Sequence, residues 1–378
     1  MKFMHLSDLH IGKRVNEYSM MDDQKYILSQ IVRLLDEEKP DAVLIAGDIY
    51  DKSIPGADAV MLFDRFLTQV SERKVPVFLI SGNHDSQERL AFGRNILSHS
   101  HIYISEVFRG KIEKITKEDE YGPIHFYLIP YLKPAVVKHY MPEADITDYQ
   151  SAMEAVIGSL EIEYGERNVF LVHQFLTGAL RSESEEVSVG GLDDISAELF
   201  EGIDYVALGH IHKPQSVLRE TIRYCGTPLK YSFSEAGHDK SVTFVTMKEK
   251  GNVEITQRRL KPLRDMRKIR GSYLELTDKA NYENTEVEDY LAITLTDDED
   301  IPEVMGKLSA IYPNIMKLEY DNRRTQASGI DYLPQEAYDK KPLELFEEFY
   351  EKQNGMSMWE EQRAYLSELI ETIWEGSL

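Results

Sequence analysis

The stretch Leu44-Ile45-Ala46-Gly47-Asp48-Ile49-Tyr50-Asp51 decides the fold, because an apolar run of strand length ends there in a glycine and a carboxylate. Three other apolar runs end in the same way, at Ser7-Asp8-Leu9-His10, at Ser81-Gly82-Asn83-His84-Asp85 and at Gly209-His210-Ile211-His212. A single Gly-Asp after an apolar run usually marks only a turn. In an open α/β sheet, however, ligands bind beyond the carboxyl ends of the strands, where such loops converge. The four segments together therefore predict one shared site.

Strand-like and helix-like segments alternate through the first hundred residues, which is typical of a layered α/β domain. The elements expected there are strands at 2–7, 41–46 and 75–80 and helices at 22–38, 58–72 and 86–97. The following residues predict a second group of strands and one helix. These are strands at 102–104, 111–116, 124–130, 169–172, 205–208, 221–225, 241–247 and 253–258 and a helix at 148–164. Two facing sheets flanked by helices accommodate this order.

Changes in composition and in the strand and helix patterns along the sequence predict four parts. Residues 1–257 form the α/β domain, and residues 258–270 form a basic linker with seven basic residues and one acidic residue. That linker is either a solvated connector or a phosphate-contacting strip. Residues 271–333 form a small α+β module, with strands expected at 272–276, 290–295 and 315–320 and a helix at 302–311. Residues 335–378 form two amphipathic helices, which either pack on the body of the protein or bind a partner helix.

Composition limits the class of protein. The 378 residues carry a net charge of −23, which opposes binding to nucleic acid. Residues 271–378 hold 25 acidic and 9 basic residues, so their net charge is −16 and only −7 remains for residues 1–270. The single cysteine, Cys225, excludes a disulfide framework and a cysteine-rich metal site. With no signal peptide and no apolar run of membrane-spanning length, we expect a cytoplasmic protein.

The residue types at the predicted site favour two metal ions. Aspartate, asparagine and histidine without cysteine suit Mn²⁺ or Fe²⁺ and tolerate Zn²⁺. We expect one ion to be bound by Asp8, His10, Asp48 and His212, and the other by Asp48, Asn83, His173 and His210. Two divalent ions held side by side activate water and neutralise charge on a phosphoryl group. The site therefore predicts phosphoester hydrolysis.

His84 and Asp85 are the expected catalytic pair. His84 follows the metal residue Asn83, so its ring could face the leaving-group oxygen and donate a proton to it. Asp85 could hold that imidazole in one tautomer. The alternative is that His84 only caps the following helix. The remaining histidines lack this context, and we expect most of them to be structural or exposed.

The ordered motifs resemble those of the calcineurin-like metallophosphoesterases over residues 1 to about 250. They are Asp-x-His at 8–10, Gly-Asp-x-x-Asp at 47–51, Gly-Asn-His-Asp at 82–85, a lone histidine at 173 and Gly-His-x-His at 209–212. Within that superfamily, Val172-His173-Gln174-Phe175 and Tyr224-Cys225-Gly226-Thr227-Pro228 resemble the SbcD-type nuclease subunits. The small module and the helical tail fit that family too.

The resemblance implies a four-layer, two-sheet core and a Mn²⁺-dependent DNA nuclease that processes DNA breaks in repair, recombination and replication. Such an enzyme acts as a 3'-to-5' exonuclease on duplex ends and as an endonuclease on single strands and hairpins. It works as a dimer with an SbcC-type ATPase and is associated with the nucleoid. By this resemblance, 271–333 is a capping domain that helps admit DNA, 335–378 binds the ATPase, and helices 58–72 and 86–97 pair across the dimer. At Asp51 some relatives carry a histidine, so no catalytic role is assigned to it.

Two competing functions remain open. One is a phosphatase or cyclic-nucleotide phosphodiesterase of the same superfamily. Phosphoprotein phosphatases commonly have Arg-Gly soon after the Gly-Asp-x-x-Asp segment, whereas Asp51 is followed here by Lys52-Ser53-Ile54-Pro55. The other is a scaffold that has lost its metals. Such a protein should lack ligands, and none of the expected ones is missing here.

Overall fold

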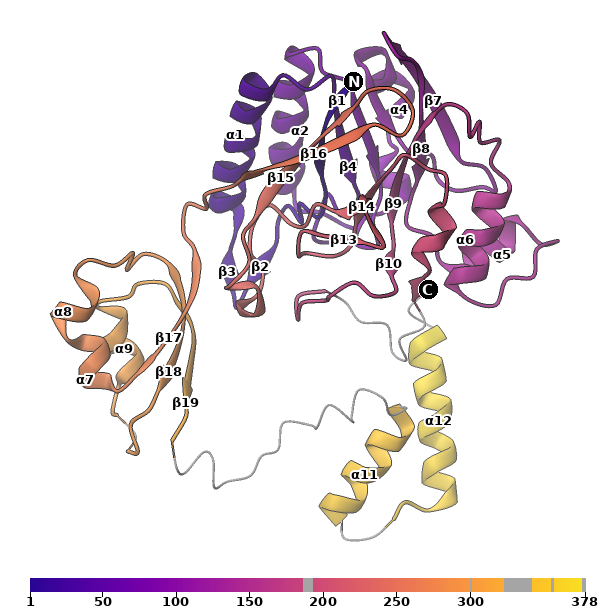
Figure 1. Ribbon diagram of the computed structural model, residues 1–378. Coiled ribbons are helices and arrows are strands. Elements are labelled where there is room, and N and C mark those ends of the chain that lie inside the picture. The colour runs from indigo at the N-terminus through magenta and orange to yellow at the C-terminus, as the bar shows by residue number, and fades with distance from the viewer. Residues whose placement is uncertain (186–192, 300, 323–341, 355–356, 376–378) are drawn as a thin grey trace. The chain divides into compact units, whose positions relative to one another are not determined.

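The computed structural model describes residues 1–185, 193–299, 301–322, 342–354 and 357–375 (Figure 1). The described residues divide into two compact units. The larger unit contains every sheet, and the smaller one contains helices α11 (Pro342–Asn354) and α12 (Glu360–Glu375). None of the described helices combines the length and the apolarity that a membrane span requires.

The first sheet carries the motifs of residues 1–85. Four of its strands run parallel: β1 (Lys2–Leu6), β4 (Ala42–Ala46), β5 (Val77–Ile80) and β6 (Ile102–Ile104). On the other side of β1, β15 (Ser241–Met247) pairs antiparallel with β1, and β16 (Val253–Arg259) pairs antiparallel with β15 at the sheet edge. Side chains alternate along each strand. In β4, Val43 and Ile45 pack on α1 (Met21–Glu38) and α2 (Ala57–Glu72), while Ala42 and Leu44 belong to the core on the opposite face.

The second sheet faces that opposite core. Its central strands are parallel and its two edge strands are antiparallel. In spatial order they are β13 (Gln215–Val217), β14 (Arg219–Tyr224), β12 (Tyr205–Gly209), β9 (Arg167–His173), β8 (Gly122–Ile129) and β7 (Glu113–Asp119). Between the sheets, the ring of Phe78 stacks on Phe126 at 4.2 Å, and Phe3 meets Phe126 edge-on at 5.5 Å.

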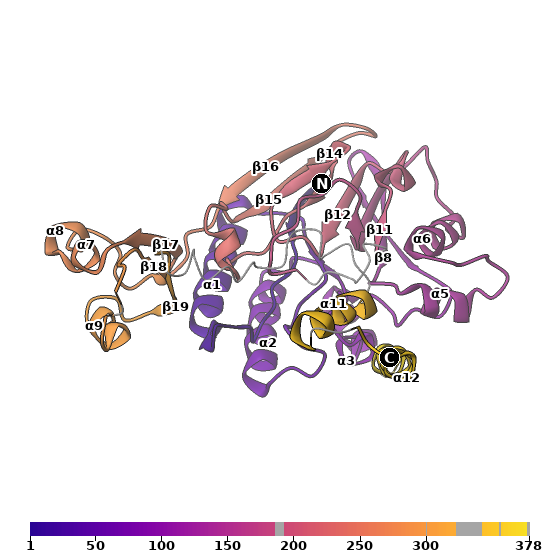
Figure 2. The same cartoon turned by 90° about the horizontal axis from the view of Figure 1, so that it is seen from below.

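Helices α5 (Pro134–Tyr140) and α6 (Tyr149–Gly158) cover the outer face of the second sheet, where they share a core with its strands. On the far side of the first sheet, α1 and α2 lie side by side, as Figure 2 shows from below. The order helix, sheet, sheet, helix confirms the predicted four-layer α/β core.

The small module is built on three parallel strands, β17 (Met266–Gly271), β18 (Tyr290–Leu295) and β19 (Ile315–Tyr320). The predicted strand at 272–276 is wrong, because helix α7 (Tyr273–Thr277) occupies these residues. Ser272 and Glu275 form a capping box there, which starts a helix. Helices α8 (Lys279–Tyr282) and α9 (Val304–Ser309) complete the module, so the helix expected at 302–311 is shorter.

Other elements differ from expectation at their ends. The helix expected at 86–97 is two short helices, α3 (Gln87–Leu90) and α4 (Arg94–Leu97), separated by Gly93 at a φ of 74°. That left-handed conformation interrupts an α-helix and suits glycine. The helix expected to reach residue 164 ends at Gly158. Two small strand pairs were not predicted: β2 (Arg14–Val15) with β3 (Tyr18–Ser19), and β10 (Phe175–Leu176) with β11 (Asp194–Ile195).

Candidate metal centre

Backbone hydrogen bonds hold the loops after β1 and β4 against each other. The amide of Asp8 donates to the Gly47 carbonyl at 3.0 Å, and the amide of His10 donates to the Asp48 carbonyl at 3.0 Å. The loop after β5 joins them, because the amide of His84 donates to Asp48 Oδ1 at 2.9 Å. Three strand ends therefore present their polar side chains at one place, as parallel strands in one sheet require.

Four of the predicted metal ligands have a strained backbone. Asp8, His10, Asp48 and His210 have φ values of 52°, 44°, 51° and 98°, in the left-handed region that non-glycine residues rarely adopt. Each such residue costs on the order of 1–3 kcal/mol and persists only where the surrounding structure enforces it. Strain gathered at one group of polar residues is typical of a functional site.

Two glycines allow close packing at this point, Gly209 between the two sheets and Gly82 between two loops of the first sheet. A β-carbon on Gly209, at the end of β12, would lie 1.9 Å from the Ala46 carbonyl oxygen and 2.7 Å from Nδ1 of His173. A β-carbon on Gly82 would lie 2.1 Å from Oδ1 of Asp48. Any larger residue at these positions would push the loops apart, so both glycines set the spacing of the site.

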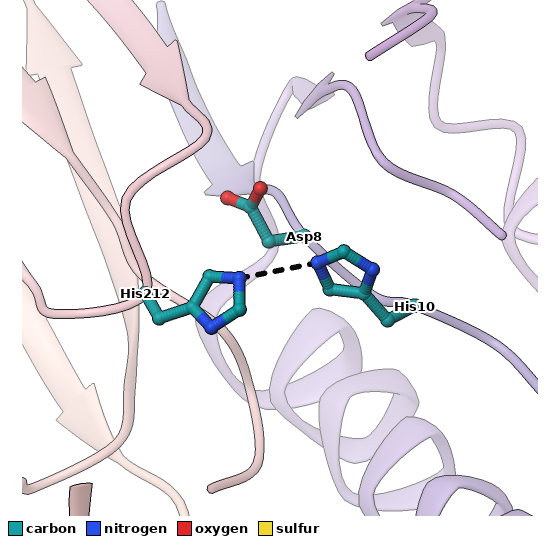
Figure 3. A group of neighbouring side chains, drawn as sticks. All are labelled: Asp8, His10 and His212. Atoms are coloured by element: carbon teal, nitrogen blue, oxygen red, sulfur yellow. Dashed lines mark hydrogen bonds between the residues drawn. The ribbon is translucent and has the colours of Figure 1, made fainter. Parts of the chain in front are cut away.

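Asp8, His10 and His212 form the first half of the site. Their ligand atoms all lie within 4.8 Å of one another, and all three residues are buried. Nε2 of His10 and Nε2 of His212 face each other at 3.2 Å (Figure 3). Asp8 and His10 follow β1 of the first sheet, whereas His212 follows β12 of the second, so this half bridges the two sheets.

Asn83, His173 and His210 form the second half. The Asn83 side-chain oxygen lies 2.9 Å from Nε2 of His173 and 3.0 Å from Nδ1 of His210. Asp48 connects the halves, because its Oδ2 is 3.4 Å from Nε2 of His173 and 3.7 Å from Nε2 of His10. The structure thus brings together all seven predicted ligands, which we call the metal cage: Asp8, His10, Asp48, Asn83, His173, His210 and His212.

The hydrogen bonds of His173 test whether this cage fits a cation. Its Nδ1 lies 2.8 Å from the Ala46 carbonyl, which can only accept, so Nδ1 carries the proton. In the neutral ring, the Nε2 lone pair then points at oxygens of Asn83 and Asp48, which are acceptors too. Lone pairs facing one another need a positive charge between them. The donor set and its arrangement therefore fit divalent metal ions.

The pKa values in the metal-free cage also show that its buried carboxylates favour positive charge nearby. Burial opposes the charging of His173, but Asp48 beside it raises the His173 pKa to about 9. Burial raises the pKa of Asp8 to about 7. The Asp48 carboxylate is also buried, yet His173, His10 and His84 keep its pKa well below the ordinary value. Since ligands must be deprotonated to bind metal, ions entering the cage would displace protons.

His84 lies at the rim of the cage and is its most exposed histidine, with 17% of its side chain accessible. Its Nε2 is 4.0 Å from Oδ2 of Asp48, and its Nδ1 is 3.0 Å from the Asp51 carbonyl oxygen. The sequence predicted that Asp85 orients this ring. In the structure the Asp85 carboxylate instead accepts hydrogen bonds from the amides of Ile49, Tyr50 and Gly82, so it fixes the loops around the site.

Several polar residues at the site were not predicted. Ser184, Glu235 and Lys240 lie behind His212, and Lys13 pairs with Asp51 at 2.7 Å beside His10. Ser184 lies in the polar segment Ser182-Glu183-Ser184-Glu185, where neighbouring Glu185 is buried. These residues follow no apolar strand, so the pattern that predicted the ligands could not indicate them.

The basic segment, residues 258–270, is almost fully paired with acids of the same chain. Its five arginines each form an ion pair: Arg258 with Glu38, Arg259 with Asp239, Arg264 with Asp23, Arg267 with Asp289 and Arg270 with Asp321. Among the described residues, Lys261 and Lys268 have no ion-pair partner. Asp23, on α1, also accepts a hydrogen bond from the Tyr290 hydroxyl at 2.7 Å and so connects the small module to the core.

Comparison with known proteins agrees with this geometry. Residues 1–214 match the calcineurin-like phosphoesterase family. Residues 262–354 match the SbcD C-terminal domain, described as the type 5 capsule protein repressor C-terminal domain. The two matches in this order support an SbcD-type nuclease subunit and confirm the resemblance found in the sequence.

Two solved structures are similar over most of their own length but diverge in detail. TT1561 of Thermus thermophilus is 14% identical with a TM-score of 0.39, over 68% of this chain and 98% of that one. Yfce, a phosphoesterase from E. coli, is 12% identical with a TM-score of 0.27, over 69% of this chain and all of that one. The family match covers more than half of the sequence and includes every residue of the metal cage. The chain belongs to the calcineurin-like phosphoesterase family, whose members are metal-dependent phosphoesterases.

Proposed function

We propose that this chain is the nuclease subunit of an SbcC-type complex and hydrolyses DNA phosphodiesters with two divalent ions, Mn²⁺ most readily. The observation that supports this most strongly is the metal cage, in which seven ligands from two sheets converge beside His84. The SbcD C-terminal match supports the choice of DNA over other phosphoesters. We place the activity in break processing during repair, recombination and replication, in the cytoplasm at the nucleoid.

Each residue has a task in this proposal. Asp8, His10, Asp48 and His212 would hold one ion, and Asp48, Asn83, His173 and His210 the other. When bound, the ions would activate water and neutralise charge on the phosphodiester. His84 would stabilise or protonate the leaving oxygen, because its ring lies at the accessible rim. Asp85 would keep the loops in register through its three amide contacts.

The direct test compares two substrates. The purified chain with Mn²⁺ should cleave single-stranded DNA and hairpins, and should degrade duplex ends in the 3'-to-5' direction, faster than it hydrolyses a phosphomonoester. Hydrolysis of the monoester alone would favour a phosphatase. Hydrolysis of a cyclic nucleotide alone would favour the corresponding phosphodiesterase, and no hydrolysis with any divalent metal would favour a scaffold. Metal analysis of the active protein would show whether Mn²⁺ is the preferred ion.

We also propose a homodimer that forms through helix 58–72, which is α2, and segment 86–97, which holds α3 and α4. Large apolar side chains are exposed near and on these helices: Ile54 at 68%, Val60 at 44%, Met61 at 51%, Phe92 at 85% and Ile96 at 76%. Exposed apolar side chains gathered in this way are typical of protein interfaces. Sedimentation should show a dimer that Phe92→Glu dissociates, while Tyr164→Glu, at a residue with 57% exposure outside these helices, should leave it intact.

The C-terminal helices are the proposed site for the ATPase. In α11 and α12, Phe346, Phe349 and Leu369 are exposed, although Arg363 of α12 pairs with Glu347 of α11. Deleting residues 335–378 should prevent pull-down of an SbcC-type partner and preserve cleavage of small substrates. Retained association would contradict this assignment. The remaining boundaries, with a nuclease domain at 1–257, a linker at 258–270 and a DNA-admitting cap at 271–333, belong to the same proposal.

A further inference from the structure

A chain of polar groups lies directly behind His212, on the side away from the metal cage. Nδ1 of His212 is 2.8 Å from the Ser184 hydroxyl oxygen, and that hydroxyl donates to Oε1 of Glu235 at 2.5 Å. The same carboxylate oxygen is also 3.5 Å from Nδ1 of His212 itself. The opposite ring nitrogen, Nε2, faces His10 inside the cage.

Glu235 is held in place by a buried lysine. Nζ of Lys240 forms an ion pair with Oε2 of Glu235, and it donates to the His212 carbonyl at 2.8 Å and to the Thr227 hydroxyl at 2.6 Å. The amide of Tyr231 donates to Oε1 of Glu235 at 3.3 Å. Glu235 is fully buried and Lys240 is 5% exposed. The pair is therefore fixed by contacts on several sides.

A buried ion pair is a poor source of stability, because removing two charges from water costs about as much as their attraction returns. The position of the Glu235–Lys240 pair behind His212 explains the presence of this pair better than stability does. A neutral imidazole has two tautomers, and the acceptor behind the ring decides which nitrogen carries the proton. A carboxylate behind Nδ1 keeps the proton there and leaves the Nε2 lone pair facing the cage.

We infer that Glu235, held by Lys240, is the positioning residue that orients His212 toward the metal ion and fixes its tautomer. The inference rests on the proposed two-metal function and adds a residue to it. His10, the neighbouring histidine, lacks this support. Its buried Nδ1 has no hydrogen-bond partner among the described residues, and the Asp51 carboxylate is 3.9 Å away.

The test is Mn²⁺ binding by the full-length protein, measured by electron paramagnetic resonance titration. In Glu235→Gln, one of the two sites should weaken by about 10–100-fold, while the other stays within about threefold. Mn²⁺ activation of DNA cleavage should shift by the same factor, with kcat at saturating Mn²⁺ within about threefold of wild type. A reduced kcat without weakened binding would contradict a positioning role.

Asp204→Asn is the matched control. Asp204 is also a buried carboxylate with a lysine partner, Lys250 at 2.7 Å, and it accepts from the Asn168 amide at 2.8 Å. It precedes β12, at the end of the strand opposite the cage. This variant should lose stability and keep both Mn²⁺ affinities.

The double variant Glu235→Met, Lys240→Met separates positioning from packing. It removes both charges together, which leaves no unpaired buried charge and often preserves stability. The weakened Mn²⁺ site should persist in it. Recovery of wild-type affinity would show that Glu235→Gln acts only through unbalanced charge and would overturn the inference, as would unchanged binding by Glu235→Gln. Absence of Mn²⁺ binding by the wild-type protein would instead overturn the proposed function.

Discussion

The metal cage and the basic segment are both dense in charged and polar groups, but only the basic segment has most of its charges paired within the chain. In the basic segment, each arginine has an acidic partner elsewhere in the chain, such as Asp23 for Arg264. In the cage, Nε2 of His173 faces the side-chain oxygens of Asn83 and Asp48, and within the described part of the chain no lysine or arginine is paired with them. One cluster is complete without a ligand, and the other is not.

This difference separates structural charge from functional charge better than composition does. The basic segment suggested a phosphate-binding strip, yet its arginines are already paired with acids of the same chain, and Arg264 ties the segment to α1 through Asp23. The cage has no concentration of charge in the sequence, because its residues are spread from Asp8 to His212. Whether the polar groups of a cluster already have partners in the chain, rather than how many charges the cluster holds, indicates whether it needs a ligand.

The largest expected effect is that of Asp48→Asn. Asp48 lies between the two halves of the cage, so this change should weaken both ions and lower DNA cleavage by about 10⁴-fold or more. Metal content and cleavage rate measured on the same sample check it. Retention of two tightly bound ions would show that Asp48 does not bridge the halves and would break the contrast with the basic segment.

His84→Ala should lower kcat by about 10³-fold, because it removes a group placed to assist the leaving oxygen. Its metal content should equal that of wild type, since the ring lies at the rim of the cage. Gln87→Ala, in the helix that follows, is the matched control and should cleave normally. Loss of both ions in His84→Ala would mean that His84 is a ligand and that the cage is larger than described.

In the basic segment, Arg264→Ala should lower the stability of the fold and leave Mn²⁺ binding unchanged. It removes a partner from the buried Asp23 carboxylate, which should lower the free energy of unfolding by about 1–3 kcal/mol in chemical denaturation. Lys268→Ala, at an exposed residue in the same segment, should change it by less than about 0.5 kcal/mol. Equal effects would show that the arginine pairs do not stabilise the fold.

The last expected effect concerns the stability of the metal-free protein above neutral pH. His173 has an unfolded pKa of 6.5 and a folded pKa of about 9, so the stability from its proton is complete below pH 6.5 and lost as pH rises through about 9. Asp8, with its pKa raised to about 7, acts in the same direction at lower pH. The lowered pKa values of His10, His210 and His212 oppose it only below pH 6.5.

Between pH 7 and 9, therefore, the Tm of chelator-treated protein should fall. With Mn²⁺ it should hold, because the ion replaces the proton. His173→Asn should remove the decline in the metal-free protein. A flat Tm in wild-type metal-free protein would contradict the protonated state of the cage.

Much of the fold and of the cage could be predicted from the sequence. Buried strands such as Ala42–Ala46 are continuous apolar runs, and the ligands follow directly after them. The rest depends on contacts between distant segments. Asp85 binds three loop amides, and Glu235 meets His212 through Ser184, so neither contact leaves a periodic signal. At 272–277 apolar content suggested a strand, but the local capping box of Ser272 and Glu275 starts a helix there.

The spread of the cage along the chain has a consequence during synthesis. Its ligands begin at Asp8 and end at His212, and they come from two sheets whose first strand, β1, pairs with β15 at Ser241–Met247. A ribosome must therefore translate as far as His212, and as far as β15 for the sheet that holds β1, before any nascent polypeptide can assemble the cage. Prematurely terminated products lacking His212 should therefore lack a complete cage and any phosphoesterase activity that depends on it.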